Sequence, residues 1–336
     1  MNVIFYISRS SPVSDATKVY LKTLHMALSE EAEIVITSSL GDLVKDTLVV
    51  TYTARSFLEV KLYKPGLTVF NWYQGISPEE SLSLGGKKRG YIKHSFLEKI
   101  ALMFSAFNFF VSEAMRSHYK KKYYYKKSNY SIMPCFNSNL LPEIIKKNYK
   151  EPSFVYIGSM SSWQCIDETL SVFKNISSRI PNATLTLLTA QKDIAYNKLK
   201  ILDIDDVVRV KYVPLQDIAK ELLAYKYGFL LRENLKLNNV STPTKMSTYM
   251  GSGVIPIFSD TIDDFRHRFS SLEYTIMITS SSINDIVDQI IDFEKNVIID
   301  IEQIYKEYES VFDTYYNREK YITAIREKIP YILGNR

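Results

Sequence analysis

Residues 230–257 read Leu-Leu-Arg-Glu-Asn-Leu-Lys-Leu-Asn-Asn-Val-Ser-Thr-Pro-Thr-Lys-Met-Ser-Thr-Tyr-Met-Gly-Ser-Gly-Val-Ile-Pro-Ile. The apolar residues at the two ends of this stretch predict buried strands, and the middle predicts a helix over 244–250. Thr242 is a favourable N-cap, and Pro243 suits the first helical position because the N–H that it lacks would have no partner there. Gly251 is a favourable residue just beyond a helix end. Strand, helix and strand in this order predict a parallel βαβ unit.

The same alternation continues on both sides of this stretch. Apolar runs predict strands at 3–7, 33–37, 47–52, 67–72, 108–111, 154–157, 184–188, 207–211 and 227–231, and helical patterns separate most of them. Residues 74–80 are mostly polar and predict a loop. We therefore expect an α/β fold of two doubly wound Rossmann-like domains that face each other across a cleft, with ligands at the carboxyl ends of the strands.

Asn, Ser and Pro residues gather between positions 137 and 152, which is typical of a linker. We expect one domain over 1–140, the linker over 141–152 and a second domain over 153–312. We expect the C-terminal helix, 313–336, to pack back on the first domain.

The composition excludes several classes of protein. Of the 336 residues, 46% are hydrophobic, which excludes a disordered chain. Two cysteines, Cys135 and Cys165, and four scattered histidines fit neither a disulfide framework nor a metal cage, so no metal is expected. There is no signal-peptide pattern, and the longest apolar run is far shorter than the ~20 residues that span a bilayer. We therefore expect a cytoplasmic protein.

Positive charge is concentrated in the first half of the chain. Residues 1–150 contain 21 Lys and Arg against 12 Asp and Glu, whereas residues 151–336 contain 21 against 25. This asymmetry predicts an anionic partner for the first half, for which we favour a membrane surface on the inner face of the membrane. A solvated helix end is the alternative, and no nucleic-acid fold signature is present. The cations concerned are Lys87, Lys88, Arg89, Lys120, Lys121, Lys122, Lys126 and Lys127.

The opening stretch also gathers groups that bind anions. Arg232 follows a predicted strand, and Lys245 lies close to the start of the predicted helix. Guanidinium groups and helix N-termini both bind phosphate, and the hydroxyls of Ser241, Thr242 and Thr244 lie nearby in the sequence. These residues predict a site for an anion such as a diphosphate. The alternative is an ordinary helix start beside a surface cation.

Several motifs resemble GT-B glycosyltransferases of the family 4 type. Pro-Thr-Lys at 243–245, Tyr-Met-Gly-Ser-Gly at 249–253 and Val-Ile-Pro-Ile at 254–257 look like the donor-site signature of that family. Residues 154–157, followed by Gly-Ser at 158–159 and Trp-Gln at 163–164, are similar to the opening of its donor domain. Residues 108–112 and Met-Pro at 133–134 match its positions before the linker. Trp-Tyr-Gln-Gly at 72–75 lies where the family often has a histidine beside the acceptor cleft.

The resemblance implies a retaining glycosyltransferase that moves a sugar from a nucleotide-diphosphate donor to a hydroxyl of a glycan or lipid-linked acceptor. It would act in surface-polysaccharide assembly, with no metal or other cofactor. The first domain would bind the acceptor and the second the nucleotide sugar. Arg232 and Lys245 would stabilise the leaving diphosphate, and Asn238 or Asn239 would contact the sugar. Gly158, Ser159, Gln164, Ser241, Thr242, Thr244 and Thr248 would bind the donor, and Gln74 and Gly75 would line the acceptor side.

The sequence also departs from that family. Its paired glutamates map to Thr248 and to about Val240, and its usual Arg and Lys after the first donor-domain strand map to Ser159 and Gln164. The chain therefore resembles a divergent branch with altered donor contacts. Two alternatives remain open, namely a nucleotide-sugar epimerase with the same twin-domain build and a non-catalytic carbohydrate-binding or scaffold protein.

Overall fold

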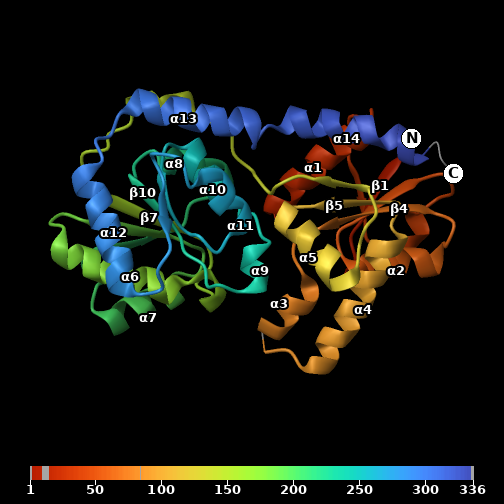
Figure 1. The fold of residues 1–336 in the computed structure, drawn as a ribbon, viewed down its shortest axis with the longest axis horizontal. Helices are drawn as coiled ribbons and strands as arrows, with labels where there is room; N and C mark the ends of the chain where they lie inside the picture. Colours follow the sequence, from red (N-terminus) through yellow and green to blue (C-terminus); the bar gives the residue numbers. More distant parts are fainter. Residues whose placement is uncertain (1, 10–14, 84, 334–336) are drawn as a thin grey trace. The chain divides into compact units, whose positions relative to one another are not determined.

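The structure is a computed structural model that describes residues 2–9, 15–83 and 85–333 (Figure 1). The chain forms two compact units. The N-terminal unit contains the described residues of Met1–Asn137, Asn239–Thr242 and Asn317–Arg336. The C-terminal unit contains Ser138–Asn238 and Pro243–Tyr316.

The N-terminal unit is built on a parallel sheet of six strands in the order β2-β1-β3-β4-β5-β6. Its strands are β1 (Val3–Tyr6), β2 (Val35–Thr37), β3 (Leu48–Thr51), β4 (Thr68–Tyr73), β5 (Phe107–Phe110) and β6 (Tyr130–Ile132). Its helices are α1 (Asp15–Leu28), the short 3-10 helix η1 (Leu40–Asp42), α2 (Ala54–Tyr63), α3 (Ser77–Ser83), α4 (Lys88–Phe104), α5 (Glu113–Tyr123) and α14 (Arg318–Leu333).

The C-terminal unit has a second parallel sheet, in the order β12-β11-β10-β7-β8-β9. Its strands are β7 (Ser153–Ile157), β8 (Thr184–Leu188), β9 (Val208–Lys211), β10 (Tyr227–Leu230), β11 (Ile255–Ser259) and β12 (Ile276–Ile278). Its α-helices are α6 (Ile166–Arg179), α7 (Lys192–Leu202), α8 (Ile218–Leu222), α9 (Lys236–Asn239), α10 (Lys245–Gly251), α11 (Asp263–Phe269), α12 (Ile283–Asn296) and α13 (Ile301–Thr314), and its 3-10 helices are η2 (Pro142–Lys146), η3 (Ser162–Gln164) and η4 (Leu215–Asp217).

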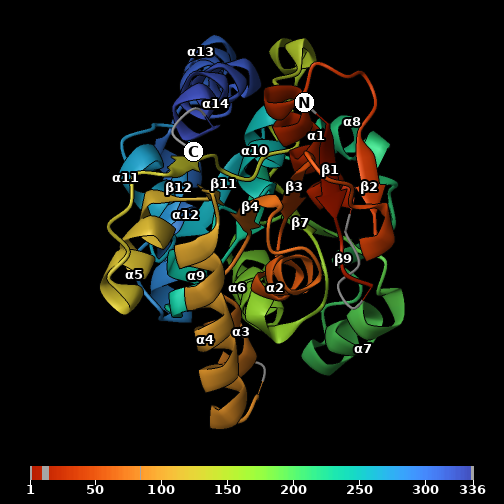
Figure 2. The same ribbon diagram turned by 90° about the vertical axis from the view of Figure 1, so that its right-hand side faces the viewer.

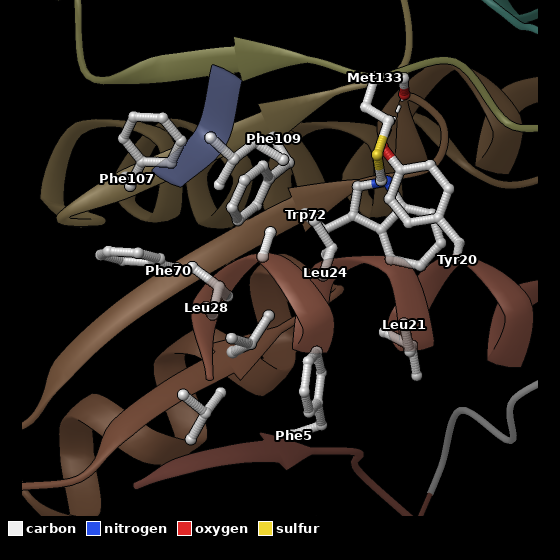
Figure 3. Close-up of a cluster of buried hydrophobic side chains, with 14 of the residues drawn as sticks. Phe5, Tyr20, Leu21, Leu24, Leu28, Phe70, Trp72, Phe107, Phe109 and Met133 are labelled. Atoms are coloured by element: carbon white, nitrogen blue, oxygen red, sulfur yellow. Dashed lines mark hydrogen bonds between the residues drawn. The ribbon is translucent and has the colours of Figure 1, made fainter. Parts of the chain in front are cut away.

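The core of the N-terminal unit packs α1 and α14 against the sheet, and Figure 3 shows the side chains between α1 and the strands. Tyr20 of α1 stacks on Trp72 of β4 with 3.8 Å between ring centroids, and its hydroxyl donates to the carbonyl oxygen of Met133 at 2.6 Å. Ile322 and Ile325 of α14 belong to the same buried cluster. A helix from the end of the chain therefore completes a core that the first half begins.

The expected α/β class with two doubly wound sheets is confirmed, and the differences are local. Residues 77–80 were expected to be loop but begin α3, because Pro78 suits a first helical turn and Glu79 and Glu80 favour a helix N-terminus. No sequence pattern predicted strand β12 or helix α2. Helix α2 has a clear start signal, since the Thr53 hydroxyl accepts from the N–H of Ser56.

Residues 141–152, expected to be a linker, pack as part of the C-terminal unit. Ile144 is fully buried, and Tyr149 donates from its hydroxyl to the carbonyl oxygen of Gly253 at 2.6 Å. Lys147 is also buried, and its Nζ donates to the carbonyl oxygens of Ser252 and Gly253 at 2.9 and 2.7 Å. The Asn, Ser and Pro residues of this stretch give it an irregular backbone, but its side chains still pack into the core of the C-terminal unit.

Candidate functional site

The strand order of the C-terminal sheet reverses between β7 and β10, which are neighbours although they are far apart in the sequence. In open parallel sheets, ligands bind outside the carboxyl ends of the strands at such a switch point. Gly158 directly follows β7, and Arg232 follows β10 after one intervening residue. Both residues therefore lie at the ligand-binding edge of this sheet.

Arg232 is buried, with 6% of its surface exposed. Its Nη1 donates to the carbonyl oxygens of Leu231 at 2.7 Å and Gln164 at 3.3 Å, and Nη2 donates to Gln164 Oε1 at 3.1 Å. Its backbone N–H donates to Ser259 Oγ at 2.8 Å. Burial lowers the pKa of the guanidinium because desolvation disfavours the charged form. Neutral oxygen atoms thus hold the side chain in place.

Lys245, the first residue of α10, brings a second positive charge to the same place. The residue as a whole is half-buried, but its ammonium end lies inside and donates to Gln164 Oε1. Burial lowers the pKa of Lys245 well below its ordinary value, and the charge of Arg232 lowers it further. A single amide oxygen therefore accepts from two cations that repel each other.

Among the described residues, no carboxylate pairs with either cation. The side chains that raise the two pKa values are those of Tyr156, Cys165 and Tyr249, and none of them is a carboxylate. Charged side chains are almost never buried unless they are paired. Two inward-facing cations without a carboxylate therefore form a site that attracts an anion, such as the phosphates of a nucleotide.

Gly158 gives the backbone close access to this site. Its φ is +143°, a conformation that favours glycine, and a Cβ there would lie 2.9 Å from Lys245 Nζ. Any other residue would therefore need strained backbone and would displace the ammonium group. The structure thus brings together Gly158, Gln164, Arg232 and Lys245, all of which the sequence singled out.

Two aromatic residues that were not among the predicted site residues also contact the cations. The Arg232 guanidinium lies 5.5 Å from the ring centroid of Trp163, and Lys245 Nζ lies 4.6 Å from that of Tyr156. Such contacts stabilise cations in place of a carboxylate. The sequence could have indicated Trp163 as a site residue, because it directly precedes Gln164 in the motif that resembles the donor domain.

Other predicted donor-binding residues use their polar side-chain groups in hydrogen bonds within the protein. Thr248 is buried, and its hydroxyl donates to the carbonyl oxygen of Thr244 at 2.9 Å. Asn238 is buried, and its Nδ2 donates to the carbonyl oxygen of Glu233 at 2.9 Å. Ser159 lies next to Gly158, and its hydroxyl donates to Ser161 Oγ at 3.1 Å. The roles predicted for these residues stay predictions.

The expected start of the helix at Thr242 and Pro243 is wrong. Helix α10 begins at Lys245, and the residue before it, Thr244, makes no side-chain cap. The Thr242 hydroxyl instead accepts from the N–H of Cys135 at 3.0 Å. Asn239 and Ser241 belong, with Thr242, to the N-terminal unit. Because α10 has only seven residues, the anion site rests on side-chain cations rather than on the helix terminus.

Gln74 and Gly75, predicted for the acceptor side, line a cavity of about 350 Å³ inside the N-terminal unit. The cavity lies at the carboxyl ends of β3 and β4, and Glu80 and Glu98 also line it. Glu98 is buried and accepts from the hydroxyls of Tyr119 at 3.2 Å and Tyr123 at 2.7 Å. Burial raises the pKa of Glu98 to about 7.

The predicted basic surface is only partly exposed. Lys122 does not belong to it, because its Nζ pairs with Glu79 at 2.8 Å and its side chain is only 15% exposed. The tyrosines Tyr123 and Tyr125 beside it are buried. The remaining cations are exposed, namely Lys87, Lys88, Arg89, Lys120, Lys121, Lys126 and Lys127.

Two kinds of feature are absent from the described residues. There is no group of three or more His, Cys, Asp or Glu side chains placed to hold a metal ion. None of the described helices combines the length and the apolar character that crossing a membrane requires.

No protein-family model matches the sequence, and no curated protein is significantly similar to it. Solved structures do match. The chain is similar to sucrose-phosphate synthase from Thermosynechococcus elongatus, with a TM-score of 0.75, 10% identity and 100% of both chains covered. It is similar to HepE of Anabaena in complex with UDP, with a TM-score of 0.69, 11% identity and 100% of both chains covered.

A third match is a mutant of TarM from S. aureus in complex with UDP, fondaparinux and alpha-GlcNAc-glycerol, with a TM-score of 0.64 and 16% identity. The alignment covers 86% of this chain and 55% of TarM, so the chain spans about half the length of that protein. At these identities the likeness concerns the fold. The chain has the GT-B fold of these glycosyltransferases, as its sequence motifs predicted.

Proposed function

We propose that the chain is a glycosyltransferase that moves a sugar from a nucleoside diphosphate to a hydroxyl of a glycan or glycolipid, with retained anomeric configuration. One observation carries the proposal: Arg232 and Lys245 converge on Gln164 at the switch point of the C-terminal sheet, with no carboxylate partner among the described residues. The fold, shared with glycosyltransferases solved in complex with UDP, supports it.

The proposed chemistry follows from the charges. When the bond between the sugar and the diphosphate breaks, negative charge grows on the leaving phosphate oxygen. Cations that are already in place stabilise this charge without reorganising. A phosphate oxygen would replace Gln164 Oε1 as the shared acceptor, which exchanges a neutral partner of both cations for an anionic one. Gly158 lets the phosphates come close to the backbone.

The remaining roles extend the same proposal. Asn239 contacts the transferred sugar, and Ser241 and Thr244 bind the donor. Gln74 and Gly75 line the acceptor side. The reaction needs no metal or other cofactor and serves surface-polysaccharide assembly, on the inner face of an anionic membrane where a lipid-linked acceptor would lie.

Isothermal titration with UDP tests the anion site directly. Arg232→Ala and Lys245→Ala should each weaken UDP binding and reduce sugar transfer by about 10²-fold or more, the usual effect of losing one charge-stabilising group. Arg209→Ala and Lys220→Ala remove cations elsewhere in the same unit. These variants should leave UDP binding and sugar transfer unchanged. Normal UDP binding and turnover in both site variants would overturn the assignment.

Gln164→Glu gives a test that does not depend on removing a buried side chain. The new carboxylate would pair with both cations, so the free energy of unfolding should rise by about 1.5–3 kcal/mol, the range for hydrogen bonds to charged groups. The same carboxylate should compete with the phosphates and abolish UDP binding. If this variant is less stable than the wild type and still binds UDP, the two cations do not form the anion site.

Product analysis separates the proposed activity from the alternatives. A transferase releases UDP only when an acceptor is present, an epimerase converts the nucleotide sugar without acceptor, and a scaffold does not bind UDP. A panel of nucleotide sugars in a thermal-shift assay identifies the donor, because a ligand that binds the native state raises the apparent stability.

A further inference from the structure

Strands β7 and β10 stop pairing with each other before either strand ends. Their last pair is Val155 with Gly228. On its other side β7 stays paired with β8 as far as Ile157, and β10 stays paired with β11 as far as Leu230. The two strands therefore part at their carboxyl ends, at the switch point where the proposed anion site lies.

A side chain from another element fills the opening between these strands. Tyr249 belongs to α10, which packs on β10 and β11 (Figure 1 and Figure 2). Its Oη accepts from the backbone N–H of Ile157 at 3.3 Å and donates to the carbonyl oxygen of Phe229 at 3.1 Å. One hydroxyl thus links a donor of β7 to an acceptor of β10, where a continuous ladder would join the two strands directly.

Gly228 makes room for the ring of Tyr249. A Cβ at this position would lie 2.8 Å from three ring carbons of Tyr249, closer than a real Cβ approaches. Tyr249 is fully buried, and burial raises its pKa, so the hydroxyl keeps the proton that it donates. Because both hydrogen bonds of this hydroxyl are made to backbone, Tyr249 can act on a ligand only through the two strands.

The residues that follow the two strands are held on opposite sides of the opening. The N–H of Gly158 donates to the carbonyl oxygen of Leu188 in β8 at 3.1 Å. The N–H of Arg232 donates to Ser259 Oγ in β11 at 2.8 Å. The distance between Gly158 and Arg232 therefore depends on the distance between β7 and β10, and Tyr249 bridges that distance.

We infer that Tyr249 is a positioning residue that sets the width of the diphosphate site. Its hydroxyl keeps β7 and β10 apart, so that phosphate groups fit between the backbone at Gly158 and the guanidinium of Arg232. Without this oxygen atom, the N–H of Ile157 and the carbonyl of Phe229 would lack partners. The strands would close to pair with each other, because unpaired buried backbone groups are costly. The inference rests on the proposed function, since it concerns the same site.

Tyr308 provides a matched control, because it has a hydroxyl of the same kind at the other edge of the same sheet. Tyr308 is fully buried, and its Oη donates to the carbonyl oxygens of Tyr274 at 2.7 Å and Val254 at 3.4 Å. These two residues lie just before β11 and β12 begin, at the edge opposite the anion site. Tyr308→Phe therefore removes a buried hydroxyl without changing the width of the site.

UDP titration and turnover measurements on the full chain test the inference. Tyr249→Phe removes a single oxygen atom and keeps the aromatic ring. It should weaken UDP binding about tenfold, the effect of losing one hydrogen bond to the ligand. It should also lower the turnover number about 10²-fold, the effect of misplacing a reacting group by about 1 Å. Tyr308→Phe should lose a similar amount of stability in urea, yet bind UDP and turn over as the wild type does.

Gly228→Ala tests the same spacing without removing the hydroxyl. The new methyl group would displace the ring of Tyr249, so this variant should also weaken UDP binding about tenfold. Gly66→Ala, at a position where a Cβ meets no atom within 4 Å, should bind UDP as the wild type does. If Tyr249→Phe does not fold, Gly228→Ala provides the answer on its own.

A double-mutant cycle separates positioning from other effects of Tyr249. In the Arg232→Ala background, Tyr249→Phe should change the affinity for UDP by less than about twofold, because no guanidinium remains to be placed. A hydroxyl that acts independently of Arg232 would instead have the same effect in both backgrounds.

The outcomes for the two proposals differ. Normal UDP binding and turnover in Tyr249→Phe or Gly228→Ala would refute the inference, as would an undiminished effect in the Arg232→Ala background. If Arg232→Ala and Lys245→Ala both bind UDP normally, the proposed anion site itself is wrong. If these two variants lose UDP while Tyr249→Phe keeps it, the site stands and only the role of Tyr249 is wrong.

Discussion

Single residues show how burial changes what a charged side chain can do. Lys122 lies in the most basic run of the sequence, yet it pairs with Glu79 and approaches Glu98 Oε2 at 3.8 Å. The neighbouring Lys121 and Lys126 stay exposed. At the anion site the effect is the reverse, because Arg232 and Lys245 face inward without a carboxylate among the described residues. A count of charges along the sequence does not distinguish these situations.

Glu98 gives a prediction for the pH dependence of stability. Burial raises its pKa from 4.5 to about 7, so the folded state favours the protonated carboxyl. The stability from this group is fully present below pH 4.5 and is lost as the pH rises towards 7, by up to about 3 kcal/mol. In Glu98→Gln, where nothing titrates at this position, the free energy of unfolding should fall less over this range than in the wild type.

Urea denaturation between pH 4.5 and pH 7.5 measures this difference. Glu113→Gln is the matched control, because Glu113 lies on α5 with its side chain 57% exposed. Its stability profile should follow the wild type. If the profile of Glu98→Gln also follows the wild type, the protonated carboxyl is not the favoured form in the folded protein.

At the scale of elements, the strands were the best predicted and the helix ends the worst. Strands β1, β3, β4 and β5 of the N-terminal sheet are largely buried and fall on predicted apolar runs, because strands buried on both faces need continuous apolar sequence. The start of α10 was misplaced because the sequence cannot show that the Thr242 hydroxyl is engaged by Cys135, 107 residues away. Helix α5, by contrast, begins after a serine that caps it from within the same stretch of sequence, since the Ser112 hydroxyl accepts from the N–H of Met115 at 2.9 Å.

Lys147 joins several elements of the C-terminal unit and carries a second prediction. Its Nζ donates to carbonyl oxygens at the ends of α8 and α10, where helices leave carbonyl groups without partners. Lys147→Met should lower the free energy of unfolding by about 1–3 kcal/mol, because buried carbonyls lose their hydrogen-bond donor. The neighbouring Lys146 is exposed, and Lys146→Met should change stability little. Equal stability of the two variants in urea would show that Lys147 does not cap these helices.

At the scale of the whole molecule, the chain builds two units with separate cores and passes between them more than once. The last helix, α14, belongs to the N-terminal unit, where it packs on α1. The N-terminal core is therefore complete only after the C-terminal unit has been made. Folding of the N-terminal unit therefore depends on a helix that follows the C-terminal unit in the chain, although each unit has its own sheet.

Ile325 of α14 tests this organisation. It is fully buried in the N-terminal core, so Ile325→Ala should cost about 2–5 kcal/mol. Hydrogen exchange resolved by peptide should speed up in α1 and β1 and stay unchanged in α6 and β8, because the two cores are separate. Ile201→Ala, at a site that is 83% exposed, should change neither region. Faster exchange in both units of the Ile325 variant would contradict the division.

The sequence by itself determined the fold class, since alternating apolar runs and helical patterns leave few arrangements other than two doubly wound parallel sheets. It also identified Gly158, Gln164, Arg232 and Lys245, because their motifs are short and local. Only the tertiary structure decided that Arg232 and Lys245 share one amide oxygen, that residues 141–152 belong to a core and that Lys122 is paired. These facts depend on contacts between residues far apart in the chain, and such contacts leave no pattern in any local stretch of sequence.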